Sequence, residues 1–401
     1  MSTTDLLSRH NLNFNLYLLT ASAIFASGFA LHSLLSQSQK PSASGTDQFP
    51  ITRSPRHTLL PHLTAPQRSA LPYPPDALPS PRDINSPYGT LRAYEFGPED
   101  GRRVLLIHGI STPCLALGGL AHALVERGCR VLLFDLPGRG YSDAPSDLEH
   151  DLRLFASVIL IVLASSPLGW IGSGKDGEGF DLVGYSLGGG IAAGFTSYFG
   201  HLVRSLTLIA PSGLIRDEHI SATSRVLYAR TTLFEPILLR IVRRRLRKPL
   251  QEPRPGQPDV SGEHGADAKD AVQAEVNIEG NQRVVLSRSH PDITIEAAVN
   301  HQIEYHEGFV KAFMSSIRYG PIQRQHELWR RVGRDFEERG KEVLVVLGER
   351  DPIIKCEEIM EDAREVFGGR VQFRVMDAGH EAPVAKGDEV AEHIWGFWEG
   401  Q

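Results

Sequence analysis

The chain has 401 residues, 41% of them hydrophobic and 22% charged, a composition typical of folded globular proteins. Because 48 Asp and Glu residues outnumber 42 Lys and Arg residues, the formal net charge is −6, which argues against a dedicated nucleic-acid-binding protein. The three cysteines, Cys114, Cys129 and Cys356, are too widely spaced for a disulfide framework or a zinc site, and unpaired thiols favour a reducing compartment.

The first predicted element is an apolar segment near the N-terminus. Residues 12–35 contain no Asp, Glu, Lys or Arg, and about 20 helical residues cross a ~30 Å hydrocarbon core. Residues 16–35 therefore predict one membrane-spanning helix, within a membrane anchor over residues 1–36. Two alternatives stay open: a cleaved secretory signal, whose apolar region is normally shorter, and a helix docked on the folded domain.

Charges beside this segment bear on its orientation. Arg9 precedes it, whereas Lys40 and Arg53 follow it within ~20 residues, and positive flanks tend to stay in the cytosol. The chain also has no Asn-x-Ser/Thr glycosylation acceptor. We therefore expect a single-pass endomembrane protein whose remaining chain faces the cytosol.

Residues 37–87 differ sharply in composition from the rest. Eleven prolines lie between Pro41 and Pro87, and each removes a backbone donor and fixes φ. This density predicts a linker or loosely draped arm, part of which wraps the domain that follows.

From residue 88 onward, apolar runs alternate with helical patterns, which predicts an α/β fold with a mostly parallel sheet covered on both faces. The expected strands are Leu91–Phe96, Val104–His108, Val131–Asp135, Phe180–Gly184, Leu206–Ala210, Val343–Leu347 and Val371–Met376. The expected helices are Leu117–Arg127, Leu148–Leu163, Leu187–Tyr198 and Glu389–Trp398.

The alternation stops after Pro211 and resumes about 130 residues later. We therefore assign residues 88–213 and 336–401 to the core and residues 214–335 to an inserted cap. Within the cap, a stretch rich in Pro, Gly and charge predicts disorder over residues 251–275.

A basic amphipathic segment also lies in the cap. Residues 238–248, LLRIVRRRLRK, contain six basic residues, and on a helical wheel Arg240, Arg244 and Arg247 lie away from the apolar side. The segment is either an ordinary cap helix with a solvated basic face or a helix that meets anionic lipid.

The sharpest motif is Gly184-Tyr185-Ser186-Leu187-Gly188, between an expected strand and an expected helix. A nucleophilic serine on such a tight turn needs small residues two positions to either side, because larger side chains would collide. Ser186 is therefore the candidate nucleophile.

Two backbone N–H groups are candidates for an oxyanion hole. His108-Gly109-Ile110-Ser111 follows an expected strand upstream of Ser186 and can direct the N–H of Ile110 at a substrate carbonyl oxygen. The N–H of Leu187, at a helix N-terminus, is the second donor. His108 itself is expected to be a structural hydrogen-bonding group.

An acid and a base follow later strands. Asp351 comes directly after the strand VLVVL, and His380 follows the strand VQFRVM. An imidazole can take the serine proton, and a carboxylate fixes its tautomer. Glu349 and Asp377 are rivals of Asp351 for the acid.

These motifs resemble the α/β-hydrolase superfamily over roughly residues 88–400. One further segment adds to the resemblance: Phe134-Asp135-Leu136-Pro137-Gly138-Arg139-Gly140-Tyr141-Ser142. The resemblance implies an α/β-hydrolase fold with a helical cap after the sixth strand, Ser186 as nucleophile, His380 as general base and Asp351 as its orienting acid. Serine at this position disfavours epoxide hydrolase and haloalkane dehalogenase activity, in which aspartate is the nucleophile.

We therefore expect a serine hydrolase that cleaves carboxylic ester or related acyl bonds of a small lipophilic substrate through an acyl-enzyme, without cofactor or metal. The same triad also leaves a thioesterase, lactonase, carbon–carbon-bond hydrolase or acyltransferase open. A weakly catalytic ligand-binding protein with this fold is a further alternative.

Overall fold

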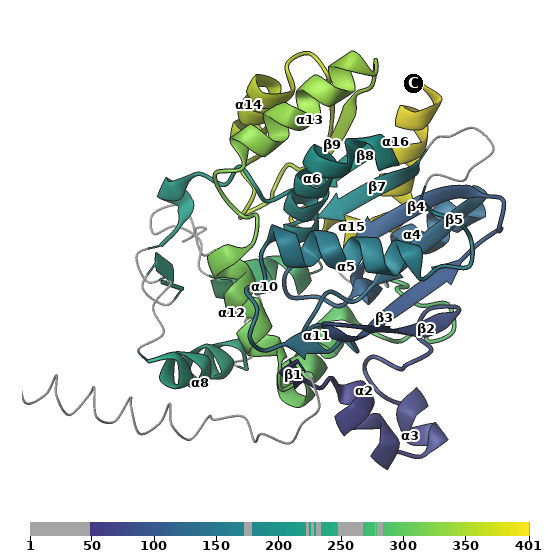
Figure 1. Ribbon diagram of the computed structural model, residues 1–401, viewed down its shortest axis with the longest axis vertical. Helices are drawn as coiled ribbons and strands as arrows, with labels where there is room; N and C mark the ends of the chain where they lie inside the picture. The colour runs from purple at the N-terminus through teal and green to yellow at the C-terminus, as the bar shows by residue number, and fades with distance from the viewer. Residues whose placement is uncertain are drawn as a thin grey trace, which may run out of the picture. The chain divides into compact units, whose positions relative to one another are not determined.

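An eight-stranded sheet forms the centre of the computed structural model (Figure 1), in the order β10-β9-β8-β7-β4-β5-β3-β2. The structure describes residues 49–171, 179–221, 224–225, 228–229, 234–247, 268–276, 278 and 284–400. The strands are β2 Pro81–Ser86, β3 Gly89–Phe96, β4 Arg102–Ile107, β5 Cys129–Phe134, β7 Phe180–Tyr185, β8 Val203–Ile209, β9 Val343–Gly348 and β10 Val371–Met376. The six strands from β10 to β5 run parallel, β3 pairs antiparallel with β5, and β2 pairs antiparallel with β3. The predicted fold class, with a mostly parallel sheet, is therefore confirmed.

Each of the seven expected strands is present in the sheet, with ends that differ from the prediction by a few residues. The central strands are largely apolar because both faces of the sheet are covered. In β9, for example, every residue is buried.

Helices pack on the sheet in two groups. In one group, α4 (Gly118–Glu126) packs against α15 (Ala382–Ala385) and α16 (Gly387–Glu399). In the other, α6 (Leu187–Phe199) packs against α5 (Leu152–Ala164) and α13 (His326–Glu338), which in turn contacts α14 (Cys356–Phe367). The four expected helices are thus present as α4, α5, α6 and α16.

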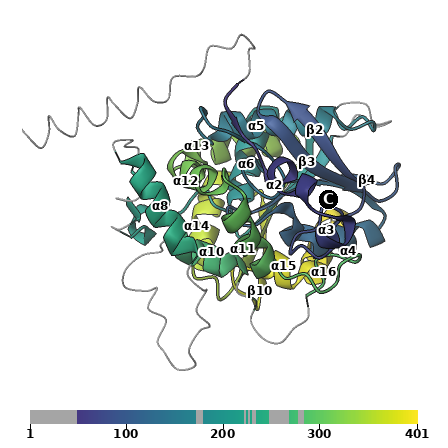
Figure 2. The same ribbon diagram turned by 90° about the horizontal axis from the view of Figure 1, so that it is seen from below.

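The helical insertion follows β8, the sixth strand of this sheet in chain order. Its longer helices are α8 (Glu235–Leu246), α10 (Ala268–Val276), α11 (Ile295–Tyr305) and α12 (Phe309–Tyr319), which Figure 2 shows grouped on one side of the sheet. The next helix, α13, belongs with the core, because the ring of its Trp329 stacks on Phe367 of α14 at 5.2 Å.

Part of the range expected to be disordered is helical. The interval 251–275 overlaps α10, in which Val272 and Glu275 are buried, whereas residues 251–267 lie outside the described part of the chain. The prediction was wrong for α10 because Ala, Val, Gln and Glu are adequate helix formers, and burial of Val272 adds hydrophobic stabilisation.

The proline-rich segment is folded from Phe49 onward. It forms α2 (Pro55–Thr58) and α3 (Ala65–Ser69), and it ends in β2, which pairs antiparallel with β3. The Tyr73 side chain is buried, and its hydroxyl donates to Asp135 Oδ2 at 3.1 Å. Residues 49–87 thus pack against the core, and the sheet begins within the range assigned to the linker.

The predicted membrane-spanning segment, residues 16–35, lies outside the described residues. Among the helices that the structure describes, none is long and apolar enough to cross a membrane.

Candidate active site

Ser186 lies on a sharp turn between β7 and α6, as the motif predicts. Its φ of +54° and ψ of −119° form a strained conformation for a residue with a side chain. A Cβ atom at Gly184 would lie 2.2 Å from the Gly188 carbonyl oxygen, and one at Gly188 would lie 2.2 Å from that of Ile107. Glycine is therefore required on both sides of the serine.

The structure brings Ser186, His380 and Asp351 together from three separate strand ends. His380 Nε2 lies 3.0 Å from Ser186 Oγ, and His380 Nδ1 lies 2.7 Å from Asp351 Oδ2. The N–H groups of Ile353 and Ile354 each donate to Asp351 Oδ1 at 2.8 Å and hold the carboxylate in place. All three side chains of this predicted triad are buried.

The two rival acids lie elsewhere. Asp377 is exposed and forms an ion pair with Arg350, and Glu349 is also exposed. The geometry therefore selects Asp351 as the partner of the imidazole.

Burial and charge oppose each other at His380. Burial lowers the pKa of the imidazole, but the Asp351 carboxylate and its hydrogen bond outweigh this, so the pKa is raised from its ordinary value of 6.5. By contrast, burial and the nearby Arg139 lower the pKa of His108 to about 3. The neutral His108 accepts from the Leu136 N–H at 2.9 Å and contacts the Gly109 carbonyl at 2.8 Å, as expected of a structural group.

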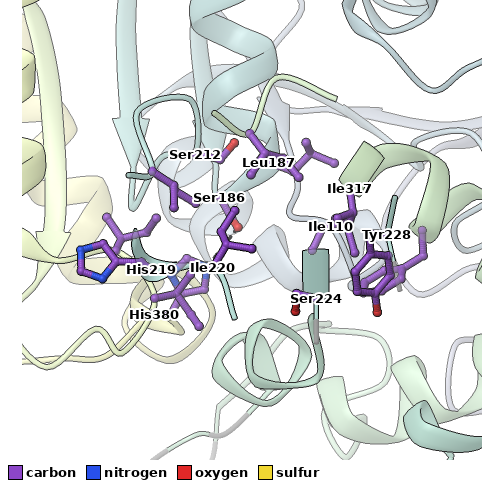
Figure 3. Close-up of a pocket in the computed structure, with 15 residues that line it drawn as sticks. Ile110, Ser186, Leu187, Ser212, His219, Ile220, Ser224, Tyr228, Ile317 and His380 are labelled. Atoms are coloured by element: carbon purple, nitrogen blue, oxygen red, sulfur yellow. Dashed lines mark hydrogen bonds between the residues drawn. The ribbon is translucent and has the colours of Figure 1, made fainter. Parts of the chain in front are cut away.

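A cavity of about 110 Å³ opens onto Ser186 and His380 (Figure 3). Most of its lining is aliphatic or aromatic: Ile110, Leu187, Ile215, Ile220, Phe313, Ile317, Ile322, Ile353 and Ile354. Its polar lining residues include Ser212, His219, Ser224 and Tyr228. The site is therefore suited to a mostly apolar ligand.

The two expected oxyanion donors differ in their surroundings. Leu187 is the first residue of α6, so its N–H has no acceptor within the helix. Ile110 borders the same cavity, but its N–H donates to Oε1 of Glu275 at 2.9 Å. The Ser111 N–H donates to Oε2 of the same carboxylate at 2.9 Å. Ile110 thus lies where the sequence predicts, but its N–H already has an acceptor.

The loop that carries Ile110 is also held from its carbonyl side. Arg139 is buried, and its Nε donates to the Ile110 carbonyl at 3.0 Å while another guanidinium nitrogen donates to Ser316 Oγ at 3.0 Å. Burial lowers the pKa of Arg139 to about 9, although Glu275 opposes this shift. The segment over residues 134–142, quoted above for its resemblance to the family, therefore braces the candidate oxyanion hole.

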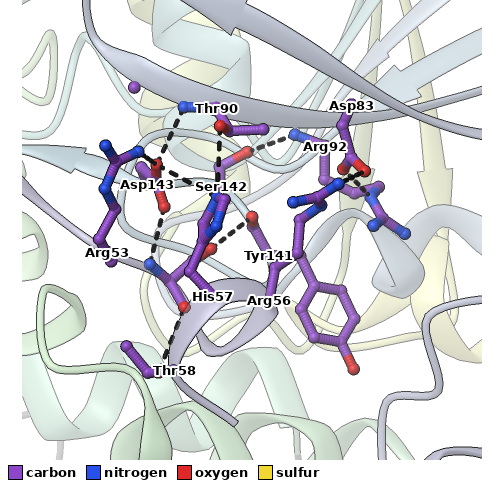
Figure 4. Close-up of polar contacts among 12 residues, drawn as sticks. Arg53, Arg56, His57, Thr58, Asp83, Thr90, Arg92, Tyr141, Ser142 and Asp143 are labelled. Carbon is purple, nitrogen blue, oxygen red and sulfur yellow. Dashed lines mark hydrogen bonds and ion pairs between the residues drawn. The ribbon is translucent and has the colours of Figure 1, made fainter. Parts of the chain in front are cut away.

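The N-terminal arm fixes the end of this bracing loop (Figure 4). The carboxylate of Asp143 accepts from the Ser54 N–H at 2.7 Å, the Thr90 N–H at 3.0 Å and Arg53 at 2.9 Å. Because Asp143 is fully buried, these bonds tie the arm to strand β3 and to the residue that follows the bracing loop.

Sequence reasoning missed Glu275 and the role of Arg139. Glu275 is 165 residues from Ile110 in the chain and lies in a range expected to be disordered. Arg139 is inside a quoted motif, but only the fold reveals which carbonyl it reaches. Neither role has a local sequence signal.

Within the described part of the chain, one group could hold a metal ion: the ligand atoms of Glu218, His219 and Glu358 lie within 4.8 Å of one another. His219 Nε2 contacts Glu358 at 2.7 Å, and Arg216 lies 3.7 Å from the same carboxylate. This cluster is accounted for as an ion-pair network at the edge of the cavity.

Comparison with known proteins identifies the family of this chain. The family model for the alpha/beta hydrolase family matches residues 104–393. An uncharacterized protein of Mycobacterium tuberculosis is 31% identical over 145 residues, which is 36% of this chain and 39% of that protein. The match thus spans well under half the length of this curated relative.

Solved structures share the fold at low sequence identity. A bacterial membrane phospholipase A has a TM-score of 0.53 and 17% identity, with 98% of both chains covered. A thermophilic esterase from Thermogutta terrifontis has a TM-score of 0.54 and 18% identity, with 80% of this chain and 98% of that chain covered. Since the family model spans most of the chain and the fold agrees, the protein belongs to the alpha/beta hydrolase family.

Proposed function

We propose that this hydrolase cleaves carboxylic esters of a lipophilic substrate, with Ser186 as the nucleophile of an acyl-enzyme mechanism. The observation that carries the proposal is the continuous chain of contacts from Ser186 Oγ to His380 at 3.0 Å and from His380 to Asp351 at 2.7 Å, at the mouth of an apolar cavity.

The steps follow from these contacts. Ser186 Oγ attacks the ester carbonyl carbon while His380 Nε2 takes its proton, and Asp351 stabilises the imidazolium. The oxygen of the tetrahedral intermediate is stabilised by backbone N–H groups and by the positive end of α6. His380 then protonates the leaving alcohol, and a water molecule, activated by the same imidazole, releases the acid and restores Ser186.

The apolar cavity supports a substrate with a hydrocarbon acyl chain. Each buried methylene contributes about 0.8 kcal/mol, or roughly fourfold in kcat/KM, until the cavity is full. A series of p-nitrophenyl esters from acetate to palmitate tests this. We expect kcat/KM to rise from acetate to a medium-chain optimum, whereas a profile that falls steadily from acetate would contradict a lipophilic acyl group.

The pH dependence of kcat/KM is a further prediction. His380 must be neutral to accept the Ser186 proton, and its pKa is raised from 6.5. The rate should therefore rise with pH through an inflection above 6.5. Asp351→Asn removes the largest contribution that raises the pKa of His380 and leaves burial, so the inflection of the residual activity should move down. An inflection well below 6.5 in the unmodified enzyme would contradict this assignment.

We further propose that the protein works at a membrane surface, held there by the predicted helix over residues 16–35. One described element supports this proposal: the outward face of α8. Ile237 is 52% exposed and Ile241 is 41% exposed, whereas Val242 and Leu246 are buried against the cap. Exposed large apolar residues one helical turn apart are typical of helices that lie on membranes.

Arginines share this outward face. Arg240 and Arg244 are exposed, whereas Arg247 forms an ion pair with Glu304 at 2.8 Å. Each basic residue near an anionic surface contributes about 1 kcal/mol. Arg240 and Arg244 therefore complement anionic lipid headgroups. Ile237 and Ile241, on the same face of α8, are placed to contact the acyl chains.

Vesicle binding tests this face. In the full chain, Arg240→Gln combined with Arg244→Gln should weaken binding to vesicles of phosphatidylserine and phosphatidylcholine by about 30-fold, with little change on pure phosphatidylcholine. The control is Arg331→Gln with Arg334→Gln on the exposed side of α13, which should bind as the unmodified protein does. If both double variants lose vesicle binding equally, or if neither loses any, a role for α8 in membrane binding is contradicted.

A further inference from the structure

A buried carboxylate accepts from the N–H group of Ile110, one of the two candidate oxyanion donors. Glu275 has no solvent exposure, and it accepts from the N–H groups of Ile110 and Ser111 at 2.9 Å each and also from the Ser111 hydroxyl. Hydrogen bonds to an ionised acceptor are about twice as strong as neutral ones. The carboxylate is therefore firmly held.

The N–H group that Glu275 binds belongs to a residue of the candidate active site. Ile110 borders the same cavity as Ser186, Leu187 and His380, and the charge of Glu275 contributes to the raised pKa of His380. A carboxylate oxygen bonded to backbone N–H groups resembles the oxyanion of a tetrahedral intermediate in charge and in hydrogen-bonding pattern. Glu275 thus accepts from one of the two N–H groups that the sequence assigns to the oxyanion hole.

Neighbouring residues fit this carboxylate closely. A Cβ atom at Gly109 would lie 2.2 Å from Glu275 Oε1, so the loop approaches the carboxylate only because residue 109 is glycine. On the other side of the loop, the buried Arg139 guanidinium holds the Ile110 carbonyl at 3.0 Å. The backbone of Ile110 is thus held by Glu275 at its N–H group and by Arg139 at its carbonyl group.

We propose that Glu275 is a displaceable occupant of the oxyanion hole, so that the structure represents a self-blocked state and the carboxylate must leave the Ile110 N–H before the reaction proceeds. The inference rests on the proposed function and adds to it a residue that controls the same site. An ester carbonyl oxygen then replaces Glu275 as the acceptor, and no covalent bond to Glu275 forms or breaks.

Two variants of the full chain test this by the rate at which a fluorophosphonate probe labels the protein. Glu275→Ala removes the occupant, and we expect labelling at least about tenfold faster, because the phosphoryl oxygen no longer competes with a carboxylate. Ser111→Ala removes one hydroxyl donor to Glu275 but keeps the buried charges of Glu275 and Arg139. We expect this variant to be labelled only a few fold faster than the unmodified protein.

Formate provides a readout that a merely structural role would not change. As the smallest carboxylate, it should enter the vacated place in Glu275→Ala and slow labelling, and it should leave the unmodified protein unaffected. Glu296→Gln, an exposed carboxylate of α11, is the matched control and should label at the unmodified rate.

The opposite results would overturn the proposal. If Glu275 instead builds the oxyanion loop, Glu275→Ala should label more slowly and formate should restore the rate. Glu275→Ala can fail to fold because Arg139 loses its counter-charge, and the Ser111→Ala variant then tests the proposal. If Ser111→Ala is labelled no faster than the unmodified protein, Glu275 is not a displaceable occupant. A complete absence of labelling in every variant would contradict the proposed serine hydrolase itself.

Discussion

Ser186→Ala should reduce ester hydrolysis by a factor on the order of 10⁴–10⁶, because the variant lacks the hydroxyl oxygen that forms the acyl-enzyme in the proposed mechanism. The substitution removes one hydroxyl and keeps the strained turn, whose geometry is imposed by Gly184 and Gly188. The thermal midpoint should therefore shift by less than about 2 °C. Steady-state kinetics and a thermal melt of the same preparation measure both effects.

The matched control is a serine on the same helix. Ser197 lies near the end of α6, and its hydroxyl donates to the Gly194 carbonyl at 2.7 Å. Ser197→Ala should retain full activity. Activity of Ser186→Ala within about tenfold of the unmodified enzyme would assign the chemistry to another residue.

Asp351→Asn should lower kcat by about 10⁴. The amide nitrogen of the new side chain would face His380 Nδ1 as a donor, and the imidazole would then carry its proton on Nε2. That tautomer cannot accept the Ser186 proton. The bonds from Ile353 and Ile354 to the side-chain oxygen can persist, so the loss should come from the tautomer and not from a displaced loop.

Asp377→Asn is the control for this prediction. Asp377 is exposed and ion-paired with Arg350, and exposed pairs contribute little to stability. Its substitution should leave kcat within a few fold. A larger loss for Asp377→Asn than for Asp351→Asn would transfer the role of the acid to Asp377.

Much of the core and the triad could be predicted because their signals are local. Most buried parallel strands read as continuous apolar runs, and each residue of the predicted triad lies within four residues of the end of a strand. The turn at Ser186 needs glycine at fixed offsets, which the sequence displays as Gly184 and Gly188.

The features that could not be predicted depend on contacts distant in sequence. Strand β2, Pro81–Ser86, contains Pro, Asp and Asn, which are poor strand formers, and it persists at the edge of the sheet because it pairs with β3. Glu275 meets Ile110 only through the fold of the cap, and a charged residue in a polar stretch gives no sign that it will be buried.

The helical wheel of α8 predicted only in part which of its apolar residues are buried. It places Ile241 on the apolar side with Val242 and Leu246, yet Ile241 is 41% exposed whereas the other two are buried. A helix with apolar residues over more than half of its circumference does not specify which of them face the body of the protein.

The most direct test of the central proposal is capture of the acyl-enzyme. The full-length protein is mixed with p-nitrophenyl octanoate, quenched in acid within milliseconds and analysed by peptide mass spectrometry. We predict one octanoyl group, carried by the peptide that contains Ser186 and absent from Ser186→Ala. An octanoyl group on another residue, or rapid hydrolysis with no covalent adduct at any quench time, would contradict Ser186 as the nucleophile.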